Sequence, residues 1–395
     1  MAGEPQLPPA CVSDVLDNQD LLTEIIVRIG FPTSLVRAAG VCRRWLRLVS
    51  DHAFLCRFRN LHPPILLGFY LSQQHYPITA PFARFIPMLP QPPPLELATI
   101  GRRTSFRLAA YEGTHTEMVG CWNGRLVISG LLTTEGRREI IFVVYSPLCS
   151  EGGMAVIPAL DFPVLKVNVY TYRELFSKEE GDVLSYFYVM VESPTDRTKS
   201  IVHVYMLQNG DDAWRKHFTL TVDYLVYERF GPCSVLVDNK IYMGSASEIA
   251  VLDLKAASLS KIQVPQGVDF NTVDITTMLS WADDAPVLYL VHIKNLQLHI
   301  WLHKSGNNWL LEDNICLREM CATFLEHQRT PLIELNHVGS YSGFVFLKIG
   351  RCALYLDVKC RTLHKVYEMA KHDRYFGRIY PFMMIWPPIF PALKD

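Results

Sequence analysis

The chain has 395 residues and a formal net charge of −1 at pH 7, with 38 basic residues against 39 acidic ones. Its length corresponds to about two domains, and its 49% hydrophobic content is ample for a sizeable core. A nucleic-acid-binding protein normally carries a basic surplus, so this charge balance argues against a nucleic-acid partner.

The N-terminal residues and the cysteines favour an intracellular protein, in the cytoplasm or the nucleus. No apolar run reaches the ~20 residues that a membrane span requires. Residues 1–10 contain Glu4 and three prolines in place of the apolar core of a signal peptide. The ten cysteines include no Cys-x-x-Cys pair, and no spacing is typical of a zinc site. Reduced, mostly buried thiols are the simplest interpretation.

Residues 1–14 are expected to form a disordered tail, and a first helical pattern follows at residues 20–29. Asn18 or Asp20 is suited to cap the start of this helix, and Gly30 is suited to end it. At 100° per residue its apolar side chains share one face, and these are Leu21, Leu22, Ile25, Ile26 and Ile29.

Two further helical patterns lie between residues 32 and 58. Pro32 presets the backbone at the start of the second, and an apolar stripe runs from Leu35 to Val49 if the helix continues through Gly40. Gly40 can also divide this stretch into two helices, and both options stay open. A unit of about 45 residues is marginally stable alone. It therefore packs on the rest of the chain or completes its core on another protein.

The order and spacing of these residues resemble an F-box over about 40 residues. The most specific part is Val41-Cys42-Arg43-Arg44-Trp45 followed by Ser50-Asp51-x-x-Phe54, whereas Asp17-Asn18 replaces the usual Leu-Pro before the first helix. The resemblance implies that residues 15–62 form a three-helix F-box that binds a Skp-type adaptor protein. The residues expected to bind this adaptor are Leu21, Leu22, Ile25, Ile26, Ile29, Pro32, Leu35, Val41, Cys42 and Trp45. Some of them must instead hold the helices together, and the sequence does not separate the two groups.

The chain from residue 63 onward is predicted to be mostly β-structure. Residues 63–101 are rich in proline and are expected to form a connector with one strand, at residues 65–71. From residue 102 to the C-terminus, short β runs alternate with turn signals, as in residues 125–129 and 139–145. The domain that recognises a partner is therefore placed at residues 102–395.

A weak repeat runs through this β region. Its anchors are spaced 60, 47, 49 and 55 residues apart, and each is followed by a turn and a second apolar run. The anchors are Tyr145, Tyr205, Leu252, Trp301 and Leu356. A period near 50 predicts a β-propeller of five to seven blades, and the run at residues 378–386 could close the ring against residues 65–71. One β-sandwich, or a pair of them, is the competing fold.

This half is also similar to the C-terminal region of plant F-box proteins, in which strand–turn phrases build a divergent, kelch-like propeller. The double-glycine and Tyr/Trp signatures of a regular kelch repeat are absent. The chain is therefore identified as an α+β multidomain protein, with a small F-box followed by an all-β domain.

The sequence contains none of the common motifs for catalysis or cofactor binding considered below. The sequence holds no phosphate-binding glycine loop and no Gly-x-Ser-x-Gly elbow. His299 and His303 lack the glutamate of a zincin motif, and Asp283-Asp284 is interpreted as a solvated turn. We expect no catalytic residue, no cofactor and no metal site. Five tryptophans are expected to pack within or at the edges of blades: Trp122, Trp214, Trp281, Trp301 and Trp309.

The resemblance implies a substrate-recognition subunit of a Skp–cullin–F-box (SCF) ubiquitin ligase. Such a subunit docks the adaptor through the F-box and recruits a protein substrate, which the sequence does not identify, through the β domain. Two alternatives stay open. One is a Skp-binding scaffold that targets nothing for degradation. The other is a propeller enzyme with a site in its central channel, which stoichiometric copper or zinc would favour.

Overall fold

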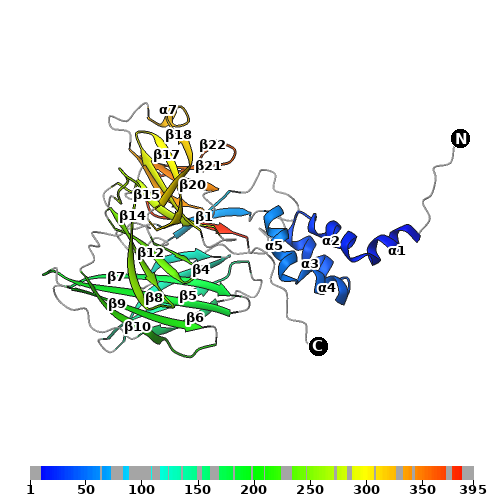
Figure 1. The fold of residues 1–395 in the computed structure, drawn as a ribbon, viewed down its shortest axis with the longest axis horizontal. Coiled ribbons are helices and arrows are strands. Elements are labelled where there is room, and N and C mark those ends of the chain that lie inside the picture. The colour runs from blue at the N-terminus through cyan, green and yellow to red at the C-terminus, as the bar shows by residue number, and fades with distance from the viewer. Residues whose placement is uncertain are drawn as a thin grey trace. The chain divides into compact units, whose positions relative to one another are not determined.

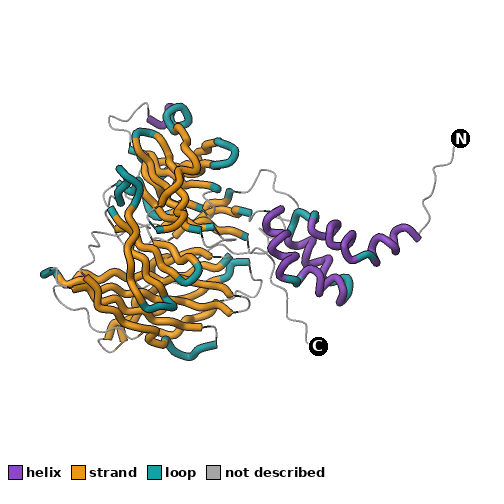
Figure 2. Tube along the Cα trace, viewed as in Figure 1, coloured by secondary structure: helices purple, strands orange, loops and turns teal. Residues whose placement is uncertain are grey.

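The computed structural model separates the chain into two compact units, and each is described by itself. One unit contains residues 1–67, 89–103 and 382–395, and the other contains residues 68–88 and 104–381. Figures 1 and 2 show helices in the first unit and strands in the second. The structure describes residues 10–62, 65–72, 83–88, 108, 116–122, 124–134, 137–148, 154–160, 169–180, 183–196, 199–208, 210–223, 234–245, 247–270, 274–282, 287–306, 308–325, 332–339, 343–370 and 376–384.

Five short helices form the N-terminal part of the first unit: α1 (Ala10–Asp17), α2 (Gln19–Val27), α3 (Pro32–Ala39), α4 (Arg43–Val49) and α5 (His52–Leu61). Two side-chain caps set their boundaries. The Asn18 side chain accepts hydrogen bonds from the Asp20 and Leu21 amides at 3.0 and 3.1 Å, and it starts α2. Asp51 accepts from the Phe54 amide at 3.0 Å and starts α5. No helix in the described part of the chain is long and apolar enough to cross a membrane.

The structure corrects two expectations about these helices. The stretch after Pro32 is divided at Gly40 into α3 and α4, because Cys42 is extended at φ −162° before α4 begins. Residues 15–62 therefore contain four helices and the end of α1, not three helices. Residues 10–14, expected in a disordered tail, belong to α1, which Arg44 holds through the Leu16 and Asp17 carbonyls at 3.0 and 2.6 Å.

The second unit is a six-bladed β-propeller, in which each blade is one sheet. The first, second and third blades have four strands each. Their strands are β3 (Thr116–Trp122), β4 (Arg125–Thr134), β5 (Arg137–Tyr145), β6 (Met154–Leu160), β7 (Val169–Glu180), β8 (Val183–Pro194), β9 (Lys199–Gln208), β10 (Arg215–Asp223), β11 (Ser234–Val237), β12 (Lys240–Ser245), β13 (Glu248–Asp253) and β14 (Ser258–Gln263).

The fourth and fifth blades repeat the same order, and a short helix, α7 (Ala322–Leu325), lies between them. Their strands are β15 (Thr277–Trp281), β16 (Leu288–Lys294), β17 (Gln297–Ser305), β18 (Asn308–Cys316), β19 (Ile333–Val338), β20 (Phe344–Ile349), β21 (Cys352–Asp357) and β22 (Thr362–Glu368). The first strand of each blade contacts the first strand of the next, from β3 to β19. These five strands therefore surround the propeller axis.

The sixth, closing blade combines strands from distant parts of the chain, in the order β2-β1-β23. Its described strands are β1 (Leu66–Ser72), β2 (Ala83–Pro87) and β23 (Ile379–Met383). The Ser72 amide donates to the Arg378 carbonyl, and the Met384 amide donates to the Ile65 carbonyl, both at 2.9 Å. The backbones approach so closely that a β-carbon at Gly377 would collide with the Ser72 carbonyl oxygen. The predicted closure of the ring by residues 65–71 and 378–386 is confirmed.

The five repeat anchors occupy the same position in their respective blades. They lie on β5, β9, β13, β17 and β21, the third strand of each four-stranded blade, and the apolar runs after them form the fourth strands. Residues 63–101 differ from the expected connector with one strand. They contain both β1 and β2, which belong to the closing blade, so the propeller begins before residue 102.

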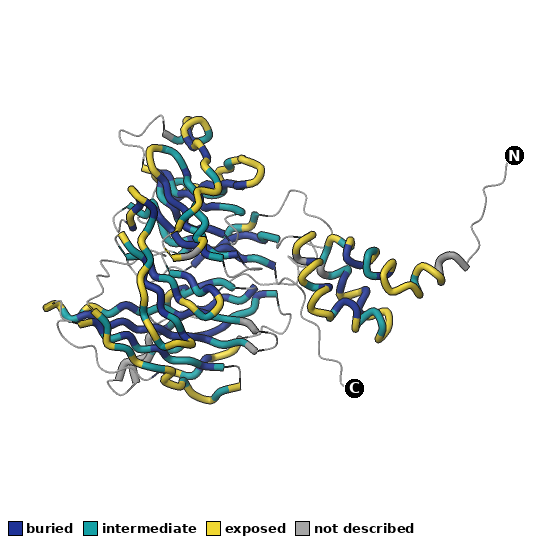
Figure 3. The backbone as a smooth tube through the Cα atoms, viewed as in Figure 1, coloured by how far each residue is buried: buried dark blue, intermediate teal, exposed yellow. Residues whose placement is uncertain are grey.

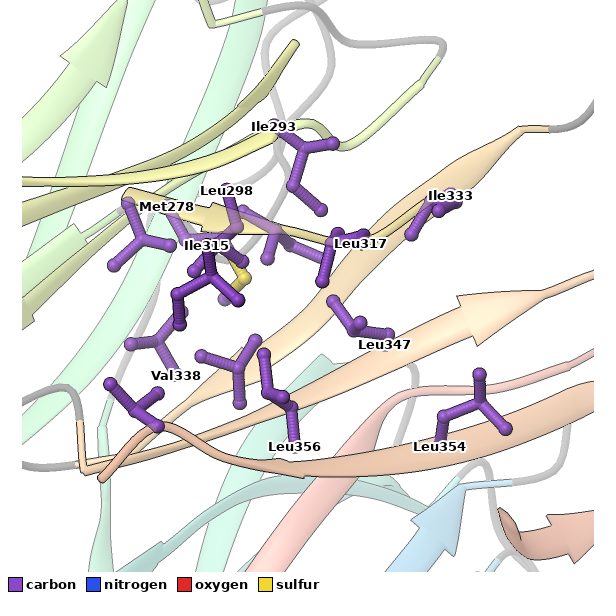
Figure 4. Close-up of a cluster of buried hydrophobic side chains, with 14 of the residues drawn as sticks. Met278, Ile293, Leu298, Ile315, Leu317, Ile333, Val338, Leu347, Leu354 and Leu356 are labelled. Atoms are coloured by element: carbon purple, nitrogen blue, oxygen red, sulfur yellow. The ribbon is translucent and has the colours of Figure 1, made fainter. Parts of the chain in front are cut away.

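Apolar clusters fill the space between neighbouring blades. Between the fourth and fifth blades, Leu298 and Ile315 meet Val338, Leu347 and Leu356 (Figure 4). Similar clusters join the first blade to the second, the second to the third and the third to the fourth. Burial alternates along the middle strands β9 and β12. The middle strands β13, β16 and β20 bury most of their residues on both faces, and Figure 3 shows such continuous buried segments. This explains why these strands are continuously apolar instead of alternating.

Candidate functional site

The ten residues expected to bind an adaptor fall into two groups in the helical unit. Leu22, Ile26 and Leu35 are fully buried. In contrast, Leu21 is 46% exposed and Ile25 is 48% exposed. The structure therefore divides residues that the sequence could not divide: the first group forms the core of the unit, and the second faces solvent.

The remaining five residues lie on the loops and helices that follow α2. Val41 is 61% exposed and Cys42 is also exposed, both in the short segment between α3 and α4. Ile29 and Trp45 are partly buried. The side chain of Pro32 lies outside the described residues. Val41 and Cys42 are thus available to a partner, whereas Ile29 and Trp45 are partly buried in the helical unit and partly exposed on its surface.

Helix geometry explains the two sides of α2. Leu22 and Ile26 are four residues apart and share the buried side with Val27. Leu21 and Ile25 are also four residues apart, and each is rotated by about 100° from the buried pair. The buried side belongs to a core that also contains Phe54 and Phe58 of α5, with ring centroids 6.2 Å apart.

Sequence reasoning missed another exposed apolar residue. Val36 on α3 is 49% exposed, directly after the buried Leu35. Adjacent residues in a helix point about 100° apart, so the sequence alone does not decide whether Val36 shares the core with Leu35. Together with Leu21, Ile25 and Val41, Val36 makes up what we call the exposed apolar set. These four side chains are therefore available for contact with a partner.

A groove of about 480 Å³ lies beside the buried core of the helical unit. Its lining residues come from α2, α4 and α5 and from the cap of α5: Gln19, Thr23, Arg47, Leu48, Asp51, Ala53, Phe54 and Arg57. Arg57 forms an ion pair with Glu24, which also lies 3.6 Å from Arg28. Arg47 carries a positive charge at the groove. The groove therefore has a charged rim that contains Arg47, Arg57 and Asp51.

The described residues hold no cluster of three or more histidine, cysteine, aspartate or glutamate side chains that could bind a metal ion. His299 and His303 lie on β17 and have separate partners. His303 shares a hydrogen bond with the Gly306 carbonyl at 2.8 Å, and the His299 ring stacks on the His292 ring with centroids 6.5 Å apart. Asp283 and Asp284 lie outside the described residues.

The five tryptophans pack at blade boundaries. Trp122 and Trp214 lie against the cluster between the first and second blades, and Trp281, Trp301 and Trp309 lie against the cluster between the third and fourth. The Trp214 indole donates to the Pro158 carbonyl at 2.8 Å. The Trp309 indole donates to the Gln263 carbonyl, also at 2.8 Å. Each bond joins the outermost strands of adjacent blades, so these two residues stabilise the ring.

Replacing Leu22 and Ile26 together by aspartate is expected to unfold the helical unit. Each substitution removes about 2–5 kcal/mol of burial and packing and also buries a charge. A unit of about 50 residues has a folding free energy of only about 3–8 kcal/mol. Limited proteolysis with mass spectrometry should show new cleavage sites between residues 18 and 62 and none in the blades. Full protease resistance of the double variant would contradict the assignment of these residues to the core.

Comparison with known protein families gives a match for the propeller part of the chain. Residues 117–390 match the family model described as "F-box protein AT5G49610-like, beta-propeller". No curated protein matches the chain.

Solved structures give weaker similarities. The periplasmic gluconolactonase PpgL of Pseudomonas aeruginosa is 11% identical, with a TM-score of 0.37, over 77% of this chain and 83% of the other. An α-L-arabinofuranosidase from Fusarium graminearum is 10% identical, with a TM-score of 0.38, over 65% of this chain and 82% of the other. Similarities at this level support no argument about function.

Proposed function

Because residues 117–390 match that family model, the chain belongs to the F-box protein AT5G49610-like β-propeller family, and we propose that it is the substrate-recognition subunit of an SCF ubiquitin ligase. In this role residues 15–62 are the F-box and bind a Skp-type adaptor. The adaptor connects them to a cullin–RING ligase in the cytoplasm or nucleus. The propeller binds a protein substrate.

The observation that carries the proposal is the exposed apolar set on the helical unit. Leu21 and Ile25 are about half exposed on α2, although their neighbours Leu22 and Ile26 are fully buried. Burying a side chain of this size is worth about 1.5–3 kcal/mol. Helices of a partner that cover these residues would gain this free energy, and the rim that contains Arg47 would orient them.

The proposed role requires no catalytic residue in this chain. A ligase subunit accelerates transfer of ubiquitin by holding the substrate close to the ubiquitin-charged enzyme, and proximity converts a bimolecular step into one within a complex. The two-unit organisation suits this task, because one unit can bind the adaptor while the other binds the substrate.

Deleting residues 1–62 is expected to separate the two binding activities. The full chain should co-purify from cells with a Skp-type adaptor and a cullin, whereas residues 63–395 should retain only proteins that bind the propeller. A substrate of the ligase should be more abundant in cells that express the shortened chain, as immunoblotting would measure. Equal recovery of the adaptor with both chains would contradict the proposal. Unchanged abundance of every propeller-bound protein would indicate a scaffolding role instead.

A further inference from the structure

Ionisable side chains from four blades gather at the propeller axis, and the proposed docking function does not use them. Glu117 lies on β3, Glu174 on β7 and His337 on β19. Arg378 directly precedes β23, and Tyr380 lies on it. These strands are the innermost strands of the first, second, fifth and closing blades. We call these five residues the axial site.

Two hydrogen-bonded contacts fix the chain on either side of Arg378. The Asn336 side chain on β19 accepts from the Ile379 amide at 2.6 Å and donates to the Gly377 carbonyl at 3.1 Å. On the opposite side, the Tyr380 hydroxyl donates to the Met118 carbonyl on β3 at 2.7 Å. The backbone at Arg378 is thus held between the fifth and first blades.

The Arg378 guanidinium lies close enough to ionisable groups of two other blades to affect them. Its positive charge lowers the pKa of both Glu174 and His337. These two residues belong to blades on opposite sides of the closing blade. The Arg378 guanidinium carbon lies 6.0 Å from the centre of the Tyr380 ring. Among the described residues, no carboxylate pairs with this guanidinium at 4.0 Å or less. Within the described part of the chain, this guanidinium therefore has a side-chain hydrogen bond to Tyr380 and no carboxylate directly bound to it.

Burial shifts two of the groups around Arg378, Glu174 and His337, toward their uncharged forms. Burial raises the pKa of Glu174 to about 7, against the opposing effects of Arg378 and of a hydrogen bond from Ser234. Burial and the Arg378 charge lower the pKa of His337 to about 3, so its imidazole is neutral. Glu174, His337 and Arg378 are each partly buried. Glu117 is the other acidic residue of the axial site, and its charge raises the pKa of Tyr380.

We propose that the axial site binds one anionic group, a carboxylate or a phosphate, with Arg378 as its cation. Arg378 pairs with the anion, and Glu174 in its protonated form donates a hydrogen bond to it. A neutral His337 adds no competing charge. The site is independent of the adaptor-docking function, because it uses only residues of the propeller.

The proposal predicts anion binding by the full chain that depends on Arg378. Thermal unfolding is measured in increasing sodium phosphate or sodium acetate at pH 7, against sodium chloride at the same ionic strength. A rise in the unfolding temperature with phosphate alone, or with acetate alone, identifies which anion the site accepts. Arg378→Gln should weaken the apparent affinity roughly tenfold to a hundredfold, as expected for loss of a hydrogen bond to a charged group. Arg215→Gln is the matched control, because Arg215 is an exposed arginine on β10 that pairs with Asp211 at 3.0 Å.

Proton linkage supplies a second readout that does not depend on removing the arginine. Acetate keeps its charge between pH 6 and pH 8, whereas Glu174 loses its proton with a pKa of about 7. Wild-type affinity for acetate should therefore be up to about tenfold weaker at pH 8 than at pH 6. Glu174→Gln should remove this pH dependence and keep the binding. Arg378→Lys, which keeps the charge, should bind more tightly than Arg378→Gln.

Two results would overturn the proposal. One is a wild-type chain whose unfolding temperature responds equally to phosphate, acetate and chloride. The other is a folded Arg378→Gln variant with the same anion response as wild type. If Arg378→Gln does not fold, equal acetate affinity of the wild type at pH 6 and pH 8 would also reject it.

Discussion

Replacing Leu21 and Ile25 together by aspartate is expected to abolish binding of a Skp-type adaptor while both units of the chain stay folded. Both side chains are about half exposed, so the aspartates remain solvated in the free protein. In the complex, each loses an apolar contact and carries a charge into the interface. At about 2 kcal/mol or more for each position, the affinity should fall roughly a thousandfold.

A matched control for this variant lies in the propeller. Leu310 and Leu311 on β18 are 48% and 42% exposed, close to the values for Leu21 and Ile25. Leu310→Asp plus Leu311→Asp should leave adaptor binding unchanged in the same titration calorimetry measurement. Wild-type affinity in the Leu21 and Ile25 double variant, with its helices intact, would refute the assignment of the docking face.

A chain that begins at residue 102 is expected to fail to form a stable propeller, whereas a chain that begins at residue 63 should form one. The shorter chain lacks β1 and β2 and leaves β23 without its neighbour in the closing blade. The buried large side chains lost with β1 are Leu67, Phe69, Tyr70 and Leu71. At about 1.5–3 kcal/mol each, their loss amounts to about 6–12 kcal/mol, comparable to the whole stability of a typical domain.

Near-ultraviolet circular dichroism and urea unfolding would compare the two chains. The chain of residues 63–395 serves as the control, since it removes α1 to α5 but keeps all six blades. It should unfold cooperatively, and the chain of residues 102–395 should show no cooperative transition. Equal midpoints for the two chains would show that β1 contributes little to ring closure.

The repeat in the sequence predicted the third strand of each four-stranded blade, because an apolar run and the turn after it recur in each of these blades. Leu252 and Leu356 are examples, each 0% exposed. The closing blade has no such repeat, since its strands come from opposite ends of the chain. The sequence therefore left the number of blades open between five and seven and placed the start of the β domain too late.

The sequence also could not predict which of the F-box-like residues are buried and which are exposed, and here the reason is different. Leu21 and Leu22 are adjacent, equally apolar and equally suited to a helix, and only the position of the neighbouring helices decides which one is buried. The axial site is also invisible locally, because Glu174 and Arg378 are about 200 positions apart. Their relation arises from the ring, and no short motif encodes it.

The pairing of β1 with β23 has a consequence for synthesis of the protein on the ribosome. Ser72 and Arg378, which hydrogen-bond to each other, are 306 residues apart, so β1 must wait for its neighbour until those residues have been translated. At about 5–20 residues per second, the delay is on the order of 15–60 seconds. During this time the aromatic and aliphatic side chains of β1 lack their final cover. Chaperones that shield nascent chains are therefore expected to associate with this protein until its last strand emerges.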